Sequence, residues 1–349
     1  MMRNAYKTHE SQGGFTLIEL MIALVLGLLV VGAAGALFLS NRRVYGSTET
    51  INRIQENQRT AFELMARDIR EAGGNPCTKN IVNMLDTSKP GGAYFTGWED
   101  GISGTDGGTN PDTITLYLAN VGAIAVSSNA GPSADIGVSS TAGLNSGDIL
   151  MVCNAEMAAI FQATALPSGS MIQHNSGNGT PGNLMKPFQI DQTTYNASVG
   201  GSNAPGYCFL PDPTNPNPNC LNQPSNSPAQ VLKPYSAKWY VAANNRGGTS
   251  LYRQIIYNGD PTTSPPPSEI AEGVTNLKAT YKVGSTGGFV SASTVTANQW
   301  KTVTAANILV TIQGVTGALS SYDVKGTNNA TLTRNLSDVV TLRNHVDVQ

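Results

Sequence analysis

Residues 15–39 read FTLIELMIALVLGLLVVGAAGALFL, and they follow a polar stretch, MMRNAYKTHESQGG, at residues 1–14. The 25 residues of the apolar run contain one charged side chain, Glu19. As a helix rising about 1.5 Å per residue, the run spans roughly 37 Å, more than the roughly 30 Å of a bilayer's hydrocarbon core. We therefore expect a helix that can cross a membrane.

Two ordinary membrane signals are alternatives for this run. A cleaved secretory signal would have a shorter apolar region followed by a small-residue cleavage site, whereas Leu39 leads into Ser40-Asn41-Arg42-Arg43. An uncut signal anchor accounts for the length but not for Glu19. A carboxylate within an apolar helix costs about 2.5–3.5 kcal/mol on insertion scales, so Glu19 is a candidate functional residue.

The sequence Gly14-Phe15-Thr16-Leu17-Ile18-Glu19 resembles the class III signal of type IV prepilins. The resemblance implies that prepilin peptidase cleaves between Gly14 and Phe15 on the cytoplasmic side and methylates the new amine of Phe15. It also implies that the neighbouring subunit's amine pairs with Glu19 and sets the axial register, which would offset the desolvation of both charges. Because Phe15 and Glu19 are one helical turn apart, the amine of Phe15 and the carboxylate of Glu19 in the same chain could pair with each other instead. Flanking positive charges are balanced, so only the resemblance places the leader in the cytoplasm.

The helical pattern continues beyond the apolar run. Apolar or small residues recur three or four apart as far as Ala72, and Gly73-Gly74 and Pro76 then predict a helix end. On the other side, Glu49/Arg53, Arg59/Glu63 and Glu63/Arg67 are spaced as ion pairs. We expect a leader at 1–14, a transmembrane and filament-core helix at 15–39, its amphipathic continuation at 40–74, and a β-rich head at 75–349.

The head is predicted to contain short strands between turn-rich loops, because Gly, Pro, Ser, Thr and Asn are abundant. The expected strands are Thr113–Leu118, Ala123–Val126, Asp148–Cys153, Ala158–Thr164, Lys238–Ala243, Ser250–Tyr257, Val274–Val283, Asn307–Val315 and Val339–Val346. The fold class is therefore α+β, a type IV pilin-like fold in which a long N-terminal helix packs on an antiparallel sheet.

Several short segments further resemble the PilW type of minor pilin. They include Ala66-Arg67-Asp68-Ile69-Arg70-Glu71-Ala72-Gly73, Gly147-Asp148-Ile149-Leu150, Trp239-Tyr240-Val241, Ser250-Leu251-Tyr252-Arg253, Gly273-Val274-Thr275-Asn276-Leu277, Trp300 and Thr341-Leu342-Arg343-Asn344. Core packing accounts for each of these residues, so they identify kinship rather than chemistry. The resemblance implies a subunit near the pilus tip that helps initiate assembly and presents an adhesin. Its partners would be other minor pilins, the major pilin, prepilin peptidase and the inner-membrane assembly platform.

The four cysteines, Cys77, Cys153, Cys208 and Cys220, suggest disulfides in a chain that is expected to be exported. Cys208 and Cys220 lie in one Pro-rich loop, so we expect them to pair, which leaves Cys77 with Cys153. One disulfide, free thiols or a metal site are the alternatives.

No catalytic pattern is found in the sequence: HExxH, Walker A, GxSxG and a strand-following GxGxxG are all absent. We expect neither an enzyme nor a cofactor or metal. The loop aspartates Asp106, Asp112 and Asp260 match no EF-hand spacing, so surface solvation is preferred over calcium binding. The net charge of −2 and the lack of a basic block argue against a nucleic-acid partner.

Three other functions remain open at this point. A minor pseudopilin of a type II secretion system shares the same kind of N-terminal signal and apolar helix. An adhesin or DNA-uptake binding module would need a basic or aromatic surface patch, and an enzyme tethered by the helix is the remaining alternative. A pilin would first be anchored in the inner membrane with its head in the periplasm, and later be part of an extracellular filament.

Overall fold

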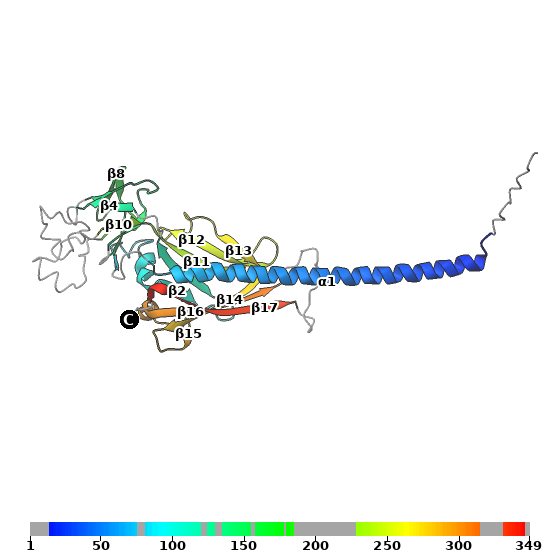
Figure 1. The fold of residues 1–349 in the computed structure, drawn as a ribbon. Coiled ribbons are helices and arrows are strands. Elements are labelled where there is room, and N and C mark those ends of the chain that lie inside the picture. The colour runs from blue at the N-terminus through cyan, green and yellow to red at the C-terminus, as the bar shows by residue number, and fades with distance from the viewer. Residues whose placement is uncertain are drawn as a thin grey trace, which may run out of the picture.

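One long helix carries a β-rich head along its C-terminal half, and its N-terminal half extends away from the head (Figure 1). The computed structural model describes residues 14–74, 81–119, 124–129, 135–154, 158–177, 179–184, 228–314 and 331–345. The α+β class and the pilin-like arrangement of helix and antiparallel sheets that the sequence predicted are confirmed.

The helix α1 spans Leu17–Glu71 without a break. Thr16 caps its first turn, because the Thr16 Oγ1 accepts a hydrogen bond from the backbone N–H of Glu19. Among the described helices, α1 is the one that is long and apolar enough to cross a membrane. Its buried positions begin at Thr50 and continue along one side as Ile54, Ala61, Met65, Ala66, Asp68, Ile69 and Ala72.

Two antiparallel sheets form the part of the head next to the helix. The five-stranded sheet has the order β13 (Ser268–Glu272), β12 (Thr249–Tyr257), β11 (Pro234–Ala243), β3 (Thr113–Ala119) and β2 (Ile102–Thr105). The four-stranded sheet has the order β15 (Phe289–Ser291), β14 (Val274–Val283), β16 (Val303–Gln313) and β17 (Thr333–Thr341). Short 3₁₀ helices η3 (Ala297–Thr302) and η4 (Arg343–His345) flank β16 and β17.

These two sheets and α1 share the main core. The helix contacts β13, β16 and β17, and the two sheets contact each other through β14 (Figure 1). Small side chains such as Ala61, Ala66 and Ala72 let the helix approach closely, and Met65 and Ile69 fill the space between. Burial of this one stripe holds the second half of α1 against the head.

A third sheet lies at the end of the head farthest from the free half of α1 (Figure 1). Its order is β1 (Ile81–Asn83), β7 (Ala158–Gln162), β6 (Ile149–Cys153), β10 (Gln230–Leu232), β4 (Ile124–Ser128), β5 (Ile136–Val138), β9 (Met171–Gln173) and β8 (Ala165–Ser168). We call these eight strands the distal sheet.

The distal sheet is covered on both faces along β6 and β7, whose residues are all buried. One face packs within the distal sheet's own core around Phe161 and Val231. The other face packs on the 3₁₀ helix η1 (Ala93–Asp100) and on β3, around Phe95, Trp98 and Tyr117. This second core fixes the distal sheet to the five-stranded sheet.

The expected strands fall on described strands, with some shifts of boundary. The bounds Val274–Val283 agree with β14, whereas Lys238–Ala243 is extended back to Pro234 and Asn307–Val315 begins earlier, at Val303. The expectation of a strand at Val339–Val346 was wrong in its limits. The strand β17 ends at Thr341, and the chain then turns through η4, because its end packs against the end of α1 instead of continuing the ladder.

Candidate assembly site

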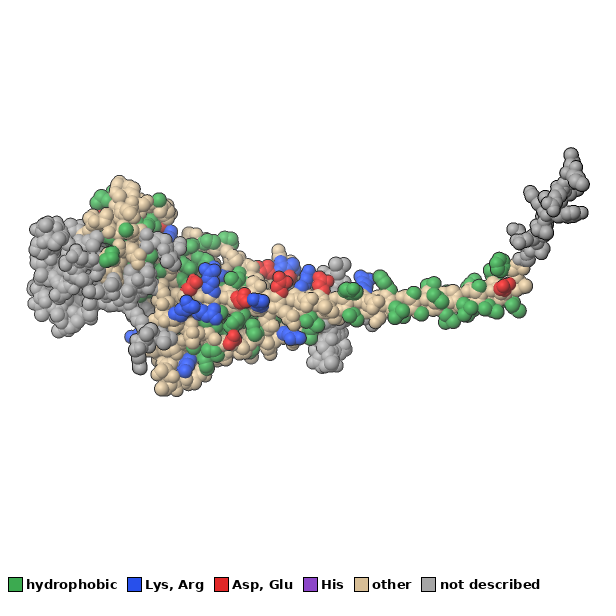
Figure 2. Space-filling model, in the orientation of Figure 1, with side chains coloured by type: hydrophobic (Ala, Val, Ile, Leu, Met, Phe, Trp, Pro, Cys, Tyr) green, Lys and Arg blue, Asp and Glu red, His purple; other side chains and the backbone are tan. Residues whose placement is uncertain are grey.

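The free half of α1 presents the predicted processing and assembly residues to the surroundings of the chain. Phe15 is 86% exposed, and Gly14 and Glu19 are also exposed. Large apolar side chains from Leu17 to Leu39 remain exposed as well, and Figure 2 shows them covering this half of the helix. An apolar surface of this extent needs a bilayer or other apolar helices around it.

Glu19 has a local role that the sequence analysis did not include. It is the third residue of α1, and its backbone N–H donates to Thr16 Oγ1 at 3.2 Å. Its carboxylate lies in the first turn, where the partial positive charge of the helix N-terminus favours an anion. The pattern Thr-x-x-Glu, which is a capping-box signature, was the signal for this role.

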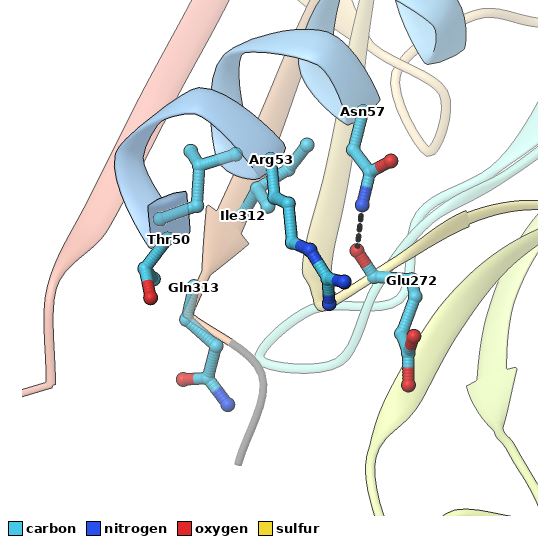
Figure 3. Close-up of a pocket in the computed structure, with 7 residues that line it drawn as sticks. Thr50, Arg53, Asn57, Glu272, Ile312 and Gln313 are labelled. Atoms are coloured by element: carbon cyan, nitrogen blue, oxygen red, sulfur yellow. Dashed lines mark hydrogen bonds between the residues drawn. The ribbon is translucent and has the colours of Figure 1, made fainter. Parts of the chain in front are cut away.

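The helix enters the head beside a small pocket, drawn in Figure 3. Asn57 Nδ2 donates to the Glu272 backbone oxygen at 3.0 Å, which attaches the helix to the end of β13. Thr50 and Arg53 from the helix and Ile312 and Gln313 from β16 line the rest of it. These contacts mark where the free half of the helix ends and the head begins.

A buried ion pair fixes the helix to the five-stranded sheet. Asp68 on α1 accepts hydrogen bonds from Arg253 Nε at 2.6 Å and from Arg253 Nη2 at 3.0 Å. Trp239 Nε1 also donates to Asp68, at 3.0 Å, and the Arg253 guanidinium lies 5.9 Å from the Trp239 ring centroid. Trp239 and Arg253 are cross-strand partners in β11 and β12, so the pairing register of these two strands places both side chains at Asp68.

The far end of α1 is capped by the last described segment of the chain. Asn344 Nδ2 donates to the Ala72 backbone oxygen at 3.1 Å, and the N–H of Gly73 donates to the Tyr117 oxygen at 2.9 Å. Gly73 has a φ of 67°, which a residue with a side chain rarely adopts. The helix is therefore held at Asn57, Asp68 and Ala72, and its position relative to the head is well defined.

The cysteines are only partly within the described residues. Cys153, at the end of β6, is disulfide-bonded and fully buried. Cys77, Cys208 and Cys220 lie outside the described residues, so the pairings Cys77–Cys153 and Cys208–Cys220 stay predictions.

The loop aspartates accept hydrogen bonds from the chain itself. The N–H of Gly108 and the Ser293 hydroxyl bind Asp106 and lower the pKa of its carboxyl. Asp112 is buried and accepts from Lys278 Nζ at 2.8 Å and from the N–H of Ala279 at 2.9 Å. In the part of the chain that the structure describes, no group of three or more His, Cys, Asp or Glu side chains is arranged to hold a metal ion.

The comparisons with known proteins identify the N-terminal region alone. The prokaryotic N-terminal methylation motif matches residues 11–35, a range that includes Gly14, Phe15 and Glu19. Among the curated proteins and the solved structures, none matches the chain. The match supports the resemblance to type IV pilins in its general form, since it does not reach the segments that resemble the PilW type. Together with the exposed apolar half of α1, the match supports a type IV pilin-like or pseudopilin-like protein, and its prepilin signal fits anchoring in the inner membrane before assembly.

Proposed function

We propose that this protein is a minor pilin, a structural subunit that enters type IV pili and helps to initiate their assembly. The single observation that carries the proposal is the division of α1. Its first half is apolar and exposed, and its second half is fixed to the head at Asn57, Asp68 and Ala72. Such a subunit acts by packing its free half among other helices, without enzymatic chemistry.

The position near the tip is the finer part of the proposal. The distal sheet lies beyond the end of α1, on the side opposite the free half of the helix (Figure 1). A subunit at the end of a filament has room for such an extension above it. Its partners in the proposal are other minor pilins, the major pilin, prepilin peptidase, the assembly platform of the inner membrane and a tip adhesin.

The experiment compares wild type with Glu19→Ala and Glu19→Gln. We expect prepilin peptidase to cleave all three chains between Gly14 and Phe15, because that bond is unchanged. Both variants should accumulate in the membrane and be depleted from sheared filaments, because the amine of a neighbouring Phe15 loses its counter-charge in a low-dielectric setting. The measurement is the ratio of membrane to filament protein, with the methylated N-terminus determined by mass spectrometry.

A third variant separates the charge of Glu19 from the helix cap. Thr16→Ala is the matched control, since it removes the cap and leaves the carboxylate in place. Wild-type ratios for both Glu19 variants would contradict a role of this charge in assembly, and surface filaments that begin at Met1 would contradict the processing. A deletion strain separates the alternatives: loss of twitching motility indicates a pilus, and loss of protein secretion indicates a pseudopilin.

A further inference from the structure

Three side chains from distant parts of the chain meet where the distal sheet joins the five-stranded sheet. Asp148, which is 4% exposed, precedes β6. Its Oδ2 accepts from Lys233 Nζ at 2.8 Å, and its Oδ1 accepts from Asn258 Nδ2 at 3.1 Å. One buried carboxylate thus contacts an amine and a carboxamide at the same time.

The register of β11 and β12 explains why Lys233 and Asn258 lie together. Tyr235 pairs with Tyr257, so Lys233 and Asn258 lie just beyond the last pair of the ladder, at the open end of this hairpin. Lys233 Nζ is 5.5 Å from the Tyr257 ring centroid, and the Lys233 side chain is only 23% exposed. The amine is therefore held on the same carboxylate that binds Asn258, and it is partly shielded from water.

The carboxamide of Asn258 is held at both of its ends. Its Oδ1 accepts a hydrogen bond from the N–H of Ile149 at 2.8 Å, while its Nδ2 donates to Asp148. These two contacts of opposite polarity fix the orientation of the amide. The backbone of Asn258 has a φ of 56°, in the left-handed region that Asn enters more readily than most residues with a side chain.

We propose that Lys233 and Asn258 form an intramolecular isopeptide bond between Nζ and Cγ. Asp148 first takes a proton from the Lys233 ammonium, and the neutral amine attacks Cγ. The Cγ–Nδ2 bond then breaks as Asp148 returns a proton to the leaving nitrogen, which departs as ammonia, and the attacking nitrogen gives its second proton to the carboxylate of Asp148. The amine and the carboxamide give one secondary amide and one ammonia, so the reaction needs no oxidant, reductant or other reactant.

The surrounding contacts match the roles that this reaction requires. Asp148 touches both the attacking and the leaving nitrogen, so a single carboxyl group serves as general base and then as general acid. The N–H of Ile149 points at the oxygen that becomes negative when the amine adds, as an oxyanion donor does. An ion pair alone would need neither the bound carboxamide nor the donor to its oxygen.

The product would close the open end of the β11–β12 hairpin with a covalent bond. The distal sheet connects to the five-stranded sheet at this point, because β10 leads directly through Lys233 into β11. A reducing agent that opens disulfides would leave this bond intact.

The experiment is peptide mapping of the full-length protein extracted from membranes in detergent. Wild type should yield, after chymotrypsin digestion, a Lys233 peptide joined to an Asn258 peptide, with a mass lower by about 17 Da because ammonia has left. The matched control is Lys233→Arg, which keeps the positive charge beside Asp148 but cannot be deprotonated to attack. Asp148→Asn removes the proton carrier and should also leave the two peptides separate.

A second reaction at Asn258 has the same mass change and must be distinguished. Gly259 follows Asn258, and an Asn-Gly pair can close into a succinimide with loss of ammonia. That product would appear equally in Lys233→Arg and would not join two peptides. Unlinked peptides of full mass in wild type, or a mass loss that persists in Lys233→Arg, would each overturn the proposal.

Discussion

Asp68 lies on the buried face of α1 and receives three hydrogen bonds from the five-stranded sheet. Because its side chain is 7% exposed and that of Arg253 is 28% exposed, water screens this pair weakly. The exposed pairs Glu49/Arg53 and Arg59/Glu63 on the same helix are mostly hydrated. The two kinds of ion pair should therefore differ in what they contribute to stability.

We predict that Asp68→Ala lowers the free energy of unfolding by about 1–3 kcal/mol, because the buried Trp239 Nε1 donor and the half-buried Arg253 guanidinium lose their acceptor. Glu63→Ala, the control on the same helix, should cost at most about 1 kcal/mol, since its ion pair with Arg59 is exposed. The measurement is denaturant unfolding of the full chain in detergent, followed by near-ultraviolet circular dichroism. Equal losses for the two variants would contradict the role assigned to Asp68.

In the sequence, Asp68, Trp239 and Arg253 stand out only as parts of segments that resemble the PilW type of minor pilin. Their contact was not predictable from the sequence, because 185 residues separate Asp68 from Arg253. Only the cross-strand register of β11 and β12 brings Trp239 and Arg253 to the same place. Glu19 and Phe15, by contrast, could be predicted from the sequence alone, because their signal is local.

At the scale of elements, periodicity predicted α1 and the long strands other than β17. The apolar run and the three-to-four spacing that follows it gave limits for α1 within two residues of Leu17–Glu71. One ion pair differed, because Arg67 binds Glu71 rather than Glu63. The strands β5 and β9 were missed because segments of three residues carry too little alternation to be distinguished from loops.

The contact between β2 and β14 offers a test of packing at this scale. A Cβ added at Gly104 in β2 would lie 2.1 Å from the Tyr281 hydroxyl oxygen and 2.8 Å from its ring. Tyr281 is fully buried and packs edge-on against Trp300, with 4.8 Å between the ring centroids, so its ring has little room to move. The glycine is therefore required by close approach rather than by a turn.

We predict that Gly104→Ala lowers the free energy of unfolding by about 1–3 kcal/mol, the usual cost of overpacking a core. Gly288→Ala is the matched control, because nothing lies within 4 Å of a Cβ at that position. Thermal unfolding of both variants gives the comparison. A Gly104→Ala protein as stable as the control would mean that β2 moves away from Tyr281 freely.

At the scale of the whole molecule, the predicted Cys77–Cys153 disulfide would connect the end of the helix to the distal sheet. Cys153 ends β6, and β1 runs parallel to β7 with Ile81 opposite Ala158, so Ile81 and Cys153 lie at the same end of the distal sheet. Cys77 lies four positions before Ile81 in the sequence, and a chain of that length reaches at most about 14 Å. This geometry supports the predicted partner of Cys153.

We therefore expect non-reducing peptide mapping to yield Cys77 linked to Cys153 and Cys208 linked to Cys220. The double substitution of Cys208→Ser and Cys220→Ser should lower the free energy of unfolding by roughly 2–4 kcal/mol, because the unfolded chain gains conformational entropy when the cross-link is lost. It should leave the Cys77–Cys153 peptide unchanged. A peptide that joins Cys77 to Cys208 would contradict both pairings.

Ala119 at the end of β3 and Pro234 at the start of β11 are register partners. The backbone therefore leaves the five-stranded sheet and returns to it across a single strand spacing of about 4.8 Å. A two-residue hairpin turn could bridge the same gap, so residues 120–233 are an insertion between two neighbouring strands of this sheet. Another folded domain with closely spaced termini and an apolar patch to cover Tyr117 could be displayed at this site, at the end of the molecule farthest from the anchor.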